Sequence, residues 1–205
     1  MPKVLVSDAL SETAVNIFRE RGVEVDYMPA LGKDKEKLLS IIGDYDGLAV
    51  RSASKATSAV IAAGKKLKVI GRAGIGVDNI DIPAATAAGV VVMNTPYGNA
   101  ITTAEHAIAM MFSLVRSIPQ ANASTHQGKW EKSGFMGTEV FGKTLGVIGC
   151  GNIGSIVADR AVGLKMRVIA FDPFLNEERA IELGVEKVDL ETLLARADIR
   201  RCTRR

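Results

Sequence analysis

The stretch Thr144-Leu-Gly-Val-Ile-Gly149-Cys-Gly151-Asn-Ile-Gly154 decides the fold of the second half of this chain. The apolar run 145–148 has the length and composition of a buried parallel strand, and it ends in three glycines spaced G-x-G-x-x-G. A helical pattern follows from Ile153 to Val162, and a second apolar run, 166–171, ends on Asp172. Strand, glycine turn, helix and strand in this order predict the βαβ unit of a dinucleotide-binding domain.

Each glycine of this motif has a predicted task. Gly149 makes the tight turn after the strand, Gly151 lets the backbone approach a pyrophosphate, and Gly154 allows close packing of the helix on the sheet. Asn152 and Ile153 open the helix, whose first amides and positive dipole face the phosphates. We therefore expect these five residues to bind the cofactor.

Asp172 predicts which dinucleotide is bound. A carboxylate at the end of the second strand accepts hydrogen bonds from the ribose hydroxyls of NAD, and it repels the 2′-phosphate of NADP. No arginine follows directly, the nearest being Arg179. The expected cofactor is NAD.

Composition excludes several classes of protein. With 205 residues, 47% of them hydrophobic, the chain can bury a core and form one or two domains. The apolar run 107–115 is too short to span a membrane, and two cysteines provide no disulfide framework, so we expect a cytoplasmic protein. The net charge of +3 depends on four arginines among the last six residues, which leaves no basic face for nucleic acid. No metal site is expected.

The first half of the chain alternates short apolar runs with helical patterns, which is typical of a parallel sheet with helices on both faces. The turn-rich segment 94–99 is the expected domain boundary, so that residues 1–97 form one domain and residues 98–205 another. A long helix is expected from Thr102 to about Arg116, and a further helix across Pro119. The strands and helices expected before the boundary are, in order, 4–7, 11–21, 23–28, 34–42, 47–51, 58–63, 67–71, 83–88 and 90–93.

Several further motifs make the chain resemble the D-isomer-specific 2-hydroxyacid dehydrogenase family, over residues 1–198. The resemblance implies an α/β architecture, with a flavodoxin-like substrate-binding domain followed by an incomplete Rossmann NAD-binding domain. The matching motifs are Val50-Arg-Ser-Ala-Ser-Lys55, Gly71-Arg-Ala-Gly-Ile-Gly-Val-Asp-Asn79, Asn94-Thr-Pro, Thr103-Ala-Glu-His106, Gly128-Lys-Trp-Glu131 and Phe135-Met-Gly.

The resemblance also implies which residues bind substrate. Arg51 and Arg72 match the family's phosphate- and carboxylate-binding arginines, because a planar guanidinium suits an oxyanion. Backbone amides around Gly74, Ile75 and Gly76 would hold the carboxylate, and Ile75 matches a position that also touches NAD. The substrate-binding residues expected are therefore Arg51, Ser52, Arg72, Gly74, Ile75 and Gly76.

No catalytic residue is expected in this chain. The family's catalytic arginine, glutamate and histidine correspond to positions beyond residue 205, and the adjacent Glu105 and His106 point in different directions on a helix. After Asp198 the family has an apolar strand, whereas this chain reads Ile199-Arg-Arg-Cys-Thr-Arg-Arg205. A one-base shift of the family's coding sequence reproduces residues 201–205, so we expect an inactive, frameshifted product whose NAD-binding domain stops after its second strand. The alternative is a natural short protein whose arginine-rich tail binds an acidic partner.

For the intact protein the resemblance implies NAD-dependent oxidation of 3-phospho-D-glycerate to 3-phosphohydroxypyruvate, which begins serine synthesis. The partner is then a small phosphorylated 2-hydroxy acid, and the intact protein is expected to be a homodimer or homotetramer. Two alternatives stay open. One is another 2-hydroxyacid dehydrogenase activity, such as reduction of glyoxylate or hydroxypyruvate, and the other is an NAD-sensing corepressor.

Overall fold

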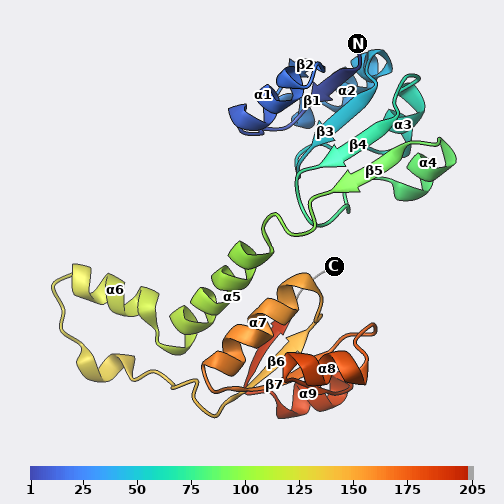
Figure 1. Ribbon diagram of the computed structural model, residues 1–205. Coiled ribbons are helices and arrows are strands. Elements are labelled where there is room, and N and C mark those ends of the chain that lie inside the picture. The colour runs from blue at the N-terminus through green and yellow to red at the C-terminus, as the bar shows by residue number, and fades with distance from the viewer. Residues whose placement is uncertain (203–205) are drawn as a thin grey trace. The chain divides into compact units, whose positions relative to one another are not determined.

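The computed structural model describes residues 1–202. The chain divides into two compact units, Met1–Gly98 and Asn99–Arg205, and each is described by itself (Figure 1). What each unit binds remains a prediction at this stage.

The first unit is built on a five-stranded parallel sheet with the strand order β2-β1-β3-β4-β5. This is the order of the flavodoxin-like doubly wound fold, as expected. Its elements are β1 (Lys3–Val6), α1 (Glu12–Glu20), β2 (Glu24–Tyr27), η1 (Leu31–Lys33), α2 (Lys35–Ile41), η2 (Ile42–Asp44), β3 (Gly47–Val50), α3 (Ser58–Ala63), β4 (Val69–Arg72), α4 (Ile82–Ala87) and β5 (Val91–Asn94).

Local sequence signals set the ends of these helices. The Ser11 hydroxyl accepts a hydrogen bond from the Ala14 amide at the start of α1, and Asp34 and Asp81 cap α2 and α4 in the same way. Beyond α4, Gly89 has a φ of +69°, a left-handed conformation that suits glycine and ends the helix. These signals explain why the expected elements lie within one or two residues of the observed ones.

The two faces of this first sheet are covered unequally. Helices α2, α3 and α4 pack on one face, where fully buried side chains of β3 and β4 such as Leu48 and Ile70 form the core. On the other face, α1 leaves an apolar hollow of about 480 Å³ over β3, β4 and β5. Val91 and Met93 on the edge strand β5 are 58% and 59% exposed.

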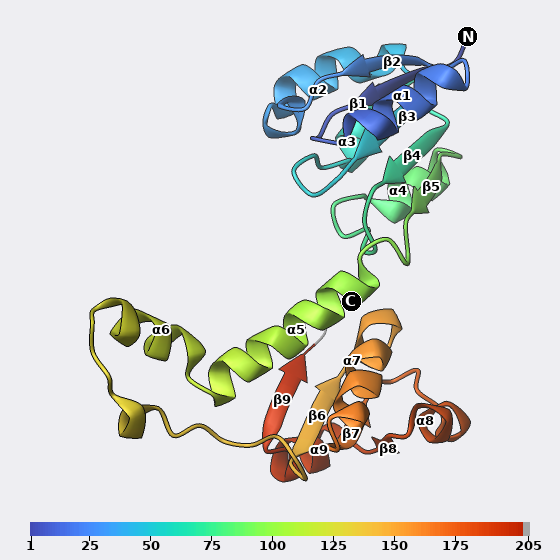
Figure 2. The same cartoon turned by 60° about the vertical axis from the view of Figure 1, so that its left-hand side comes forward.

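The second unit contains a four-stranded parallel sheet with the order β8-β7-β6-β9 (Figure 2). Counted along the chain from the glycine motif, this is the 3-2-1-4 order of the Rossmann fold. Its elements are α5 (Ala100–Val115), α6 (Ile118–His126), η3 (Lys132–Phe135), β6 (Thr144–Ile148), α7 (Asn152–Gly163), β7 (Arg167–Phe171), α8 (Glu177–Leu183), β8 (Glu186–Lys187), α9 (Leu190–Arg196) and β9 (Ile199–Cys202).

Helices cover both faces of this second sheet. The long helix α5 and the helix α7 share one core with the sheet, which contains Ala104, Met111 and Val157. On the opposite face, Leu193 of α9 is fully buried and packs with Ile169. The dinucleotide motif is thus held between two packed layers.

The expectation that this domain stops after its second strand was wrong. β9 pairs with β6 in parallel register, with Leu145 opposite Ile199 and Ile148 opposite Cys202. Asp198 fixes the start of this pairing, because its carboxylate accepts a hydrogen bond from the Thr144 amide at 2.8 Å. Strand pairing uses backbone groups, so an arginine-rich segment can join the sheet in spite of its polar composition.

Candidate functional site

The glycine turn after β6 has the geometry that a dinucleotide requires. Gly149 has a φ of +88°, and its amide donates to the Phe171 carbonyl at 2.8 Å, so the turn returns tightly to β7. A Cβ on Gly154 would overlap the Gly149 carbonyl oxygen, so only glycine lets α7 pack this closely. A Cβ on Gly151 would meet no atom within 4 Å. The backbone at Gly151, the N-cap of α7, therefore faces open space.

Asp172 ties the glycine turn to the second strand of the motif. Its side chain is 6% exposed, and its two oxygens accept hydrogen bonds from the Cys150 amide (2.9 Å) and the Phe174 amide (2.8 Å). Asp172 therefore has a structural task in addition to the one expected from the sequence.

A pocket of about 520 Å³ lies at the carboxyl end of β7, beside Asp172. The basic residues on its wall are paired with acids: Arg196 with Glu186 at 2.6 Å, and Lys187 with Glu177 at 3.4 Å. The Arg196 guanidinium holds the pKa of the Glu186 carboxyl below its usual range. Arg179, the nearest arginine after Asp172, is bonded to Glu182 at 2.7 Å. This pocket has acidic walls and compensated cations, which is unfavourable for a 2′-phosphate.

Cys150, inside the glycine turn, has a thiol with raised pKa. Burial is the main cause, and the nearby Asp172 carboxylate adds to it. The thiol therefore stays protonated at neutral pH, where it is a poor nucleophile. The turn uses the backbone of Cys150 rather than its side-chain chemistry.

In the first unit, Arg51 and Ser52 directly follow β3 and are exposed. The Arg51 amide donates to Asp8 Oδ2 at 2.5 Å, and its Nη1 donates to the Ala9 carbonyl at 3.1 Å. The backbone of Arg51 is thus fixed at the carboxyl end of the sheet, while its side chain remains open to solvent. This is the position at which ligands bind in open α/β sheets.

Arg72 has a different environment. Its side chain is only 11% exposed, and its Nη1 lies 2.6 Å from Asp78 Oδ1. The glycines of the Gly71–Asn79 loop lie beside it, since a Cβ on Gly76 would be in ordinary van der Waals contact with Arg72 Nη1, at 3.6 Å. The loop thus wraps around a guanidinium that already has one anionic partner.

The amides expected to hold a carboxylate are not equivalent. The Gly74 amide donates to the Arg72 carbonyl at 3.0 Å, whereas the Ile75 and Gly76 amides donate to no protein acceptor within residues 1–202. The Ile75 carbonyl accepts a hydrogen bond from Asn94 Nδ2 at 2.7 Å, which fixes the loop from β5. The structure brings Ile75 and Gly76 together as available donors and removes Gly74 from that set.

Two buried side-chain atoms of the described chain lack hydrogen-bond partners, and both belong to this loop. They are Arg72 Nε and Asn79 Oδ1. An unsatisfied buried polar atom costs about 1–3 kcal/mol of folding free energy, so its presence requires an explanation. For Arg72 Nε, a donor, a ligand that supplies an anionic acceptor is one such explanation.

Other candidate sites are not formed. Glu105 and His106 are both exposed on α5, and among the described residues no hydrogen bond or ion pair joins them; His126 is exposed at the end of α6. Within residues 1–202, no three histidine, cysteine or acidic side chains gather as a metal would require. In the same part of the chain, no helix is both long and apolar enough to cross a membrane.

Sequence reasoning missed two residues of the first site, Asp8 and Asn79. Asp8 is 2% exposed and contacts residues 43 to 46 positions away, so no local pattern reveals it. Asn79 is the last residue of the Gly71–Asn79 motif, but its bonds to Arg51 and Ser54 again depend on the tertiary fold.

Comparisons with known proteins agree with the fold of the chain. Residues 4–201 match the sequence model for the catalytic domain of the D-isomer specific 2-hydroxyacid dehydrogenases. A D-3-phosphoglycerate dehydrogenase of Archaeoglobus fulgidus is 51% identical over 197 residues, which are 96% of this chain and 37% of the relative. The chain therefore spans well under half the length of this curated relative.

Solved structures show the same fold. The TT0316 protein of Thermus thermophilus superposes with a TM-score of 0.88 and 31% identity, over 98% of this chain and 64% of that one. The NAD⁺-bound 3-phosphoglycerate dehydrogenase of Entamoeba histolytica superposes with a TM-score of 0.79 and 34% identity, over 99% and 62%.

Proposed function

Because the chain belongs to the D-isomer-specific 2-hydroxyacid dehydrogenase family, we propose that the whole protein oxidises 3-phospho-D-glycerate with NAD. The chain described here would contribute the pyrophosphate and ribose part of the NAD site and the anion-binding part of the substrate site. The proposal is supported by the glycine turn, by the two arginine loops and by the name of the Archaeoglobus fulgidus relative, D-3-phosphoglycerate dehydrogenase.

The residues of the second unit fit NAD. Gly151 offers open space in front of the amide end of α7, and the neighbouring residues Asn152 and Ile153 begin that helix, which favours a pyrophosphate there. Asp172, directly after β7, would accept a hydrogen bond from a ribose hydroxyl. When bound, NAD supplies a nicotinamide ring that accepts hydride from the carbon bearing the substrate hydroxyl.

The observation that carries the substrate proposal is the unsatisfied Nε of Arg72. An oxyanion beside the loop would accept from this donor and from the Ile75 and Gly76 amides. Arg51, exposed after β3, would hold a second anionic group of the same molecule. 3-Phospho-D-glycerate has two anionic groups, a carboxylate and a phosphate, whereas glyoxylate and hydroxypyruvate have only one.

Calorimetric titration of the 205-residue chain tests both parts. We expect NAD and 3-phospho-D-glycerate to bind. D-glycerate, which lacks the phosphate, should bind with an affinity at least about tenfold lower. Arg51→Ala should abolish this preference, and Lys55→Ala, an exposed cation in the same loop, is the matched control that should keep it. Equal affinity of the wild type for D-glycerate and its phosphate ester would contradict the substrate assignment.

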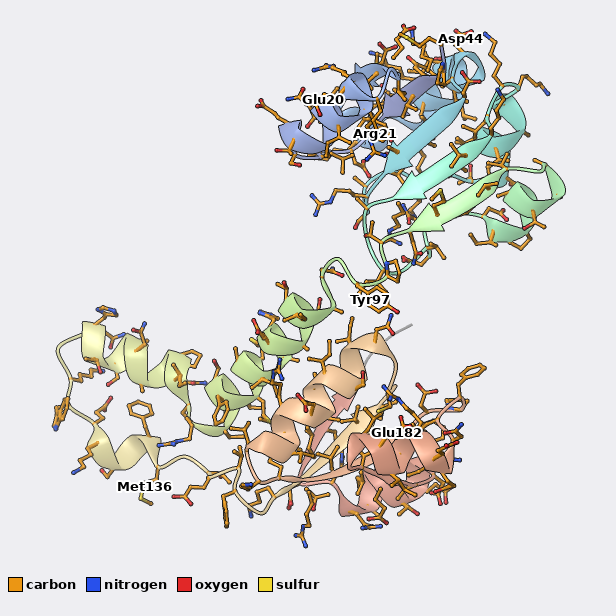
Figure 3. The ribbon with its side chains drawn as sticks, viewed as in Figure 1. Glu20, Arg21, Asp44, Tyr97, Met136 and Glu182 are labelled. Atoms are coloured by element: carbon orange, nitrogen blue, oxygen red, sulfur yellow. The ribbon has the colours of Figure 1, made fainter. Side chains whose placement is uncertain are left out.

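We also propose that the whole protein is a cytoplasmic homo-oligomer. Several large apolar side chains of the second unit are exposed on α5, α6 and the segment that follows them, and Figure 3 shows Met136 at the outer edge of that segment. They are Met110, Leu114, Ile118, Trp130, Met136 and Phe141. An apolar set of this kind marks a protein interface. Analytical ultracentrifugation of wild type and Trp130→Glu tests it, because a monomeric wild type would contradict the proposal.

A further inference from the structure

We propose that Asp8 and Asn79 are positioning residues: Asp8 holds the Arg51–Lys55 loop at the end of β1, and Asn79 joins that loop to the Gly71–Asn79 loop. Their task is to fix Arg51 and Arg72 relative to each other, so that the two cations match the two anionic groups of one substrate. This inference rests on the proposed function for its ligand, but the link between the loops can be measured without any ligand.

Asp8 anchors the first loop from beneath. It follows β1, is 2% exposed, and accepts hydrogen bonds from the Arg51 amide (2.5 Å), the Ser54 amide (3.1 Å) and the Ser54 hydroxyl (2.8 Å). Ser7 adds a hydroxyl contact to Ser54 at 2.6 Å. A buried carboxylate that accepts several hydrogen bonds from one loop defines the conformation of that loop, because each bond to a charged group is stronger than a neutral one.

The packing around Asp8 leaves no room for an alternative arrangement. A Cβ on Gly32 would overlap the Asp8 carboxylate and would lie 2.8 Å from the Ser54 amide nitrogen. The Gly32 amide also donates to the Ser7 carbonyl at 2.9 Å, which holds this glycine against the cluster. Gly32 therefore packs directly against the contact between Asp8 and Ser54.

Asn79 connects the second loop to the first. Its Nδ2 donates to the Arg51 carbonyl (2.7 Å) and to the Ser54 carbonyl (2.6 Å). Its own carbonyl accepts from the Ala56 amide at 2.9 Å. One amide group thus ties together both ends of the turn that carries Arg51, and it does so from the end of the loop that encloses Arg72.

These bonds fix the backbone amide, the backbone carbonyl and one side-chain nitrogen of Arg51, although the residue is exposed. Its amide is held by Asp8 and its carbonyl by Asn79, while Nη1 reaches the carbonyl of Ala9, the neighbour of Asp8. Arg72, for its part, is enclosed by the loop that ends at Asn79. A change at Asp8 or Asn79 should therefore act on ligand binding through the arginines, although neither residue needs to touch the ligand.

The experiment uses the 205-residue chain with Asp8→Asn and Asn79→Ala, each compared with Asp46→Asn. Asp46 is a matched control, because its carboxylate also accepts a backbone amide 43 positions away (Lys3, 3.0 Å), outside the two loops. We expect hydrogen exchange of the amides in 51–55 and 71–79 to rise together by about tenfold or more in Asp8→Asn and Asn79→Ala. In Asp46→Asn these amides should exchange as in the wild type.

Binding of 3-phospho-D-glycerate provides the second readout. Asp8→Asn should weaken binding about tenfold in the wild-type background and should add no further loss once Arg51 is replaced by alanine. If the losses of affinity caused by Asp8→Asn and Arg51→Ala multiply in the double variant, Asp8 has a general structural effect and the positioning role is overturned. Exchange that is unchanged in both loops would also overturn it.

The two proposals fail in different ways. If the wild type binds no 3-phospho-D-glycerate, the proposed substrate is wrong, and the exchange measurements still decide whether the two loops are joined. If Asp8→Asn does not fold, Asn79→Ala, which removes no buried carboxylate, decides alone. Exchange that rises in only one of the two loops in Asn79→Ala would refute the link.

Discussion

Replacing Gly151 and Gly154 separately by alanine should weaken NAD binding in both variants but lower the stability of the fold only in Gly154→Ala. The Gly151 backbone has φ −76° and ψ −154°, which alanine adopts without strain, and the new Cβ would meet no protein atom within 4 Å. The free energy of unfolding of Gly151→Ala should therefore stay within about 0.5 kcal/mol of the wild type. The same methyl group, however, occupies the space through which a pyrophosphate approaches the amides of α7.

The size of the binding loss follows from the bonds at risk. Displacing the pyrophosphate from one backbone amide forfeits a hydrogen bond to a charged group, about 1.5–3 kcal/mol. Since 1.4 kcal/mol is a factor of ten, NAD should bind Gly151→Ala about 10- to 100-fold more weakly.

Gly154→Ala should instead destabilise the fold. Its Cβ would overlap the Gly149 carbonyl oxygen and lie 3.0 Å from the carbonyl carbon, so α7 must move away from the turn. Overpacking of this kind costs about 1–3 kcal/mol, and the better helix propensity of alanine recovers about 1 kcal/mol. We expect a net loss of about 1 kcal/mol, with weaker NAD binding as a consequence of the displaced helix.

Urea unfolding and calorimetric titration with NAD measure the two quantities on the same samples. Gly163→Ala is the control, because a Cβ at this last residue of α7 would also meet no atom within 4 Å. It should leave NAD affinity unchanged. Wild-type affinity in Gly151→Ala would refute the argument that the pyrophosphate lies against this glycine.

Three further predictions concern titration and packing. Burial first, and then the hydrogen bond to Asp26 (2.7 Å), raise the pKa of Tyr45 to about 12, so an absorbance titration at 295 nm should show one late tyrosine that is missing in Tyr45→Phe. This raised pKa stabilises the folded protein fully at pH values below the unfolded-state pKa near 10, and the contribution is lost as the pH rises toward 12. Tyr45→Phe should therefore lose less free energy of unfolding than the wild type between these pH values. An unchanged dependence of the free energy of unfolding on pH would contradict this expectation. Burial also raises the pKa of Cys150, so its alkylation by iodoacetamide, mapped by mass spectrometry at pH 8, should be much slower than that of a cysteine peptide, and equal rates would show that the thiol is accessible. Leu193→Ala should lower the free energy of unfolding of the second unit by about 2–5 kcal/mol, because this fully buried side chain fills the space above Gly146; a loss below 1 kcal/mol would mean that α9 is not packed as described.

The sequence was most informative at positions where a single structural requirement explains the type of residue. Gly149, Gly151 and Gly154 predicted the βαβ unit because a positive φ, an open approach and a close packing contact each require glycine. Ser11 and Asp34 stand at the expected starts of two helices, and in the structure each accepts a hydrogen bond from the first turn of its helix. These signals act over a few residues, so they can be read from the chain alone.

The elements of the second unit that were not expected were missed for different reasons. β8 is only two exposed residues, Glu186 and Lys187, and nothing in their sequence favours a strand. α8 does carry a readable signal, since Asn176 caps it and Gly184 ends it in the left-handed region. β9 was rejected on its arginines, although its pairing with β6 depends on backbone groups.

The environment of the candidate substrate residues depends on contacts across the fold. Arg72 was expected as a free anion-binding arginine, and its ion pair with Asp78 and its burial depend on how the glycine loop closes. The bonds from Asp8 and Asn79 to the Arg51 loop join residues 25 to 46 positions apart. Sequence patterns can name these residues, but only the folded sheet shows which of them hold one another.

The most direct test of the cofactor assignment is a pair of calorimetric titrations of the 205-residue chain, one with NAD and one with NADP. The acidic pocket beside Asp172 has Arg196 and Lys187 already paired with glutamates, and Arg179 of α8 is paired with Glu182. We therefore predict that NAD binds and that NADP binds at least about tenfold more weakly. No detectable binding of NAD, or equal affinity for NAD and NADP, would contradict the assignment of the glycine turn and Asp172 as an NAD site.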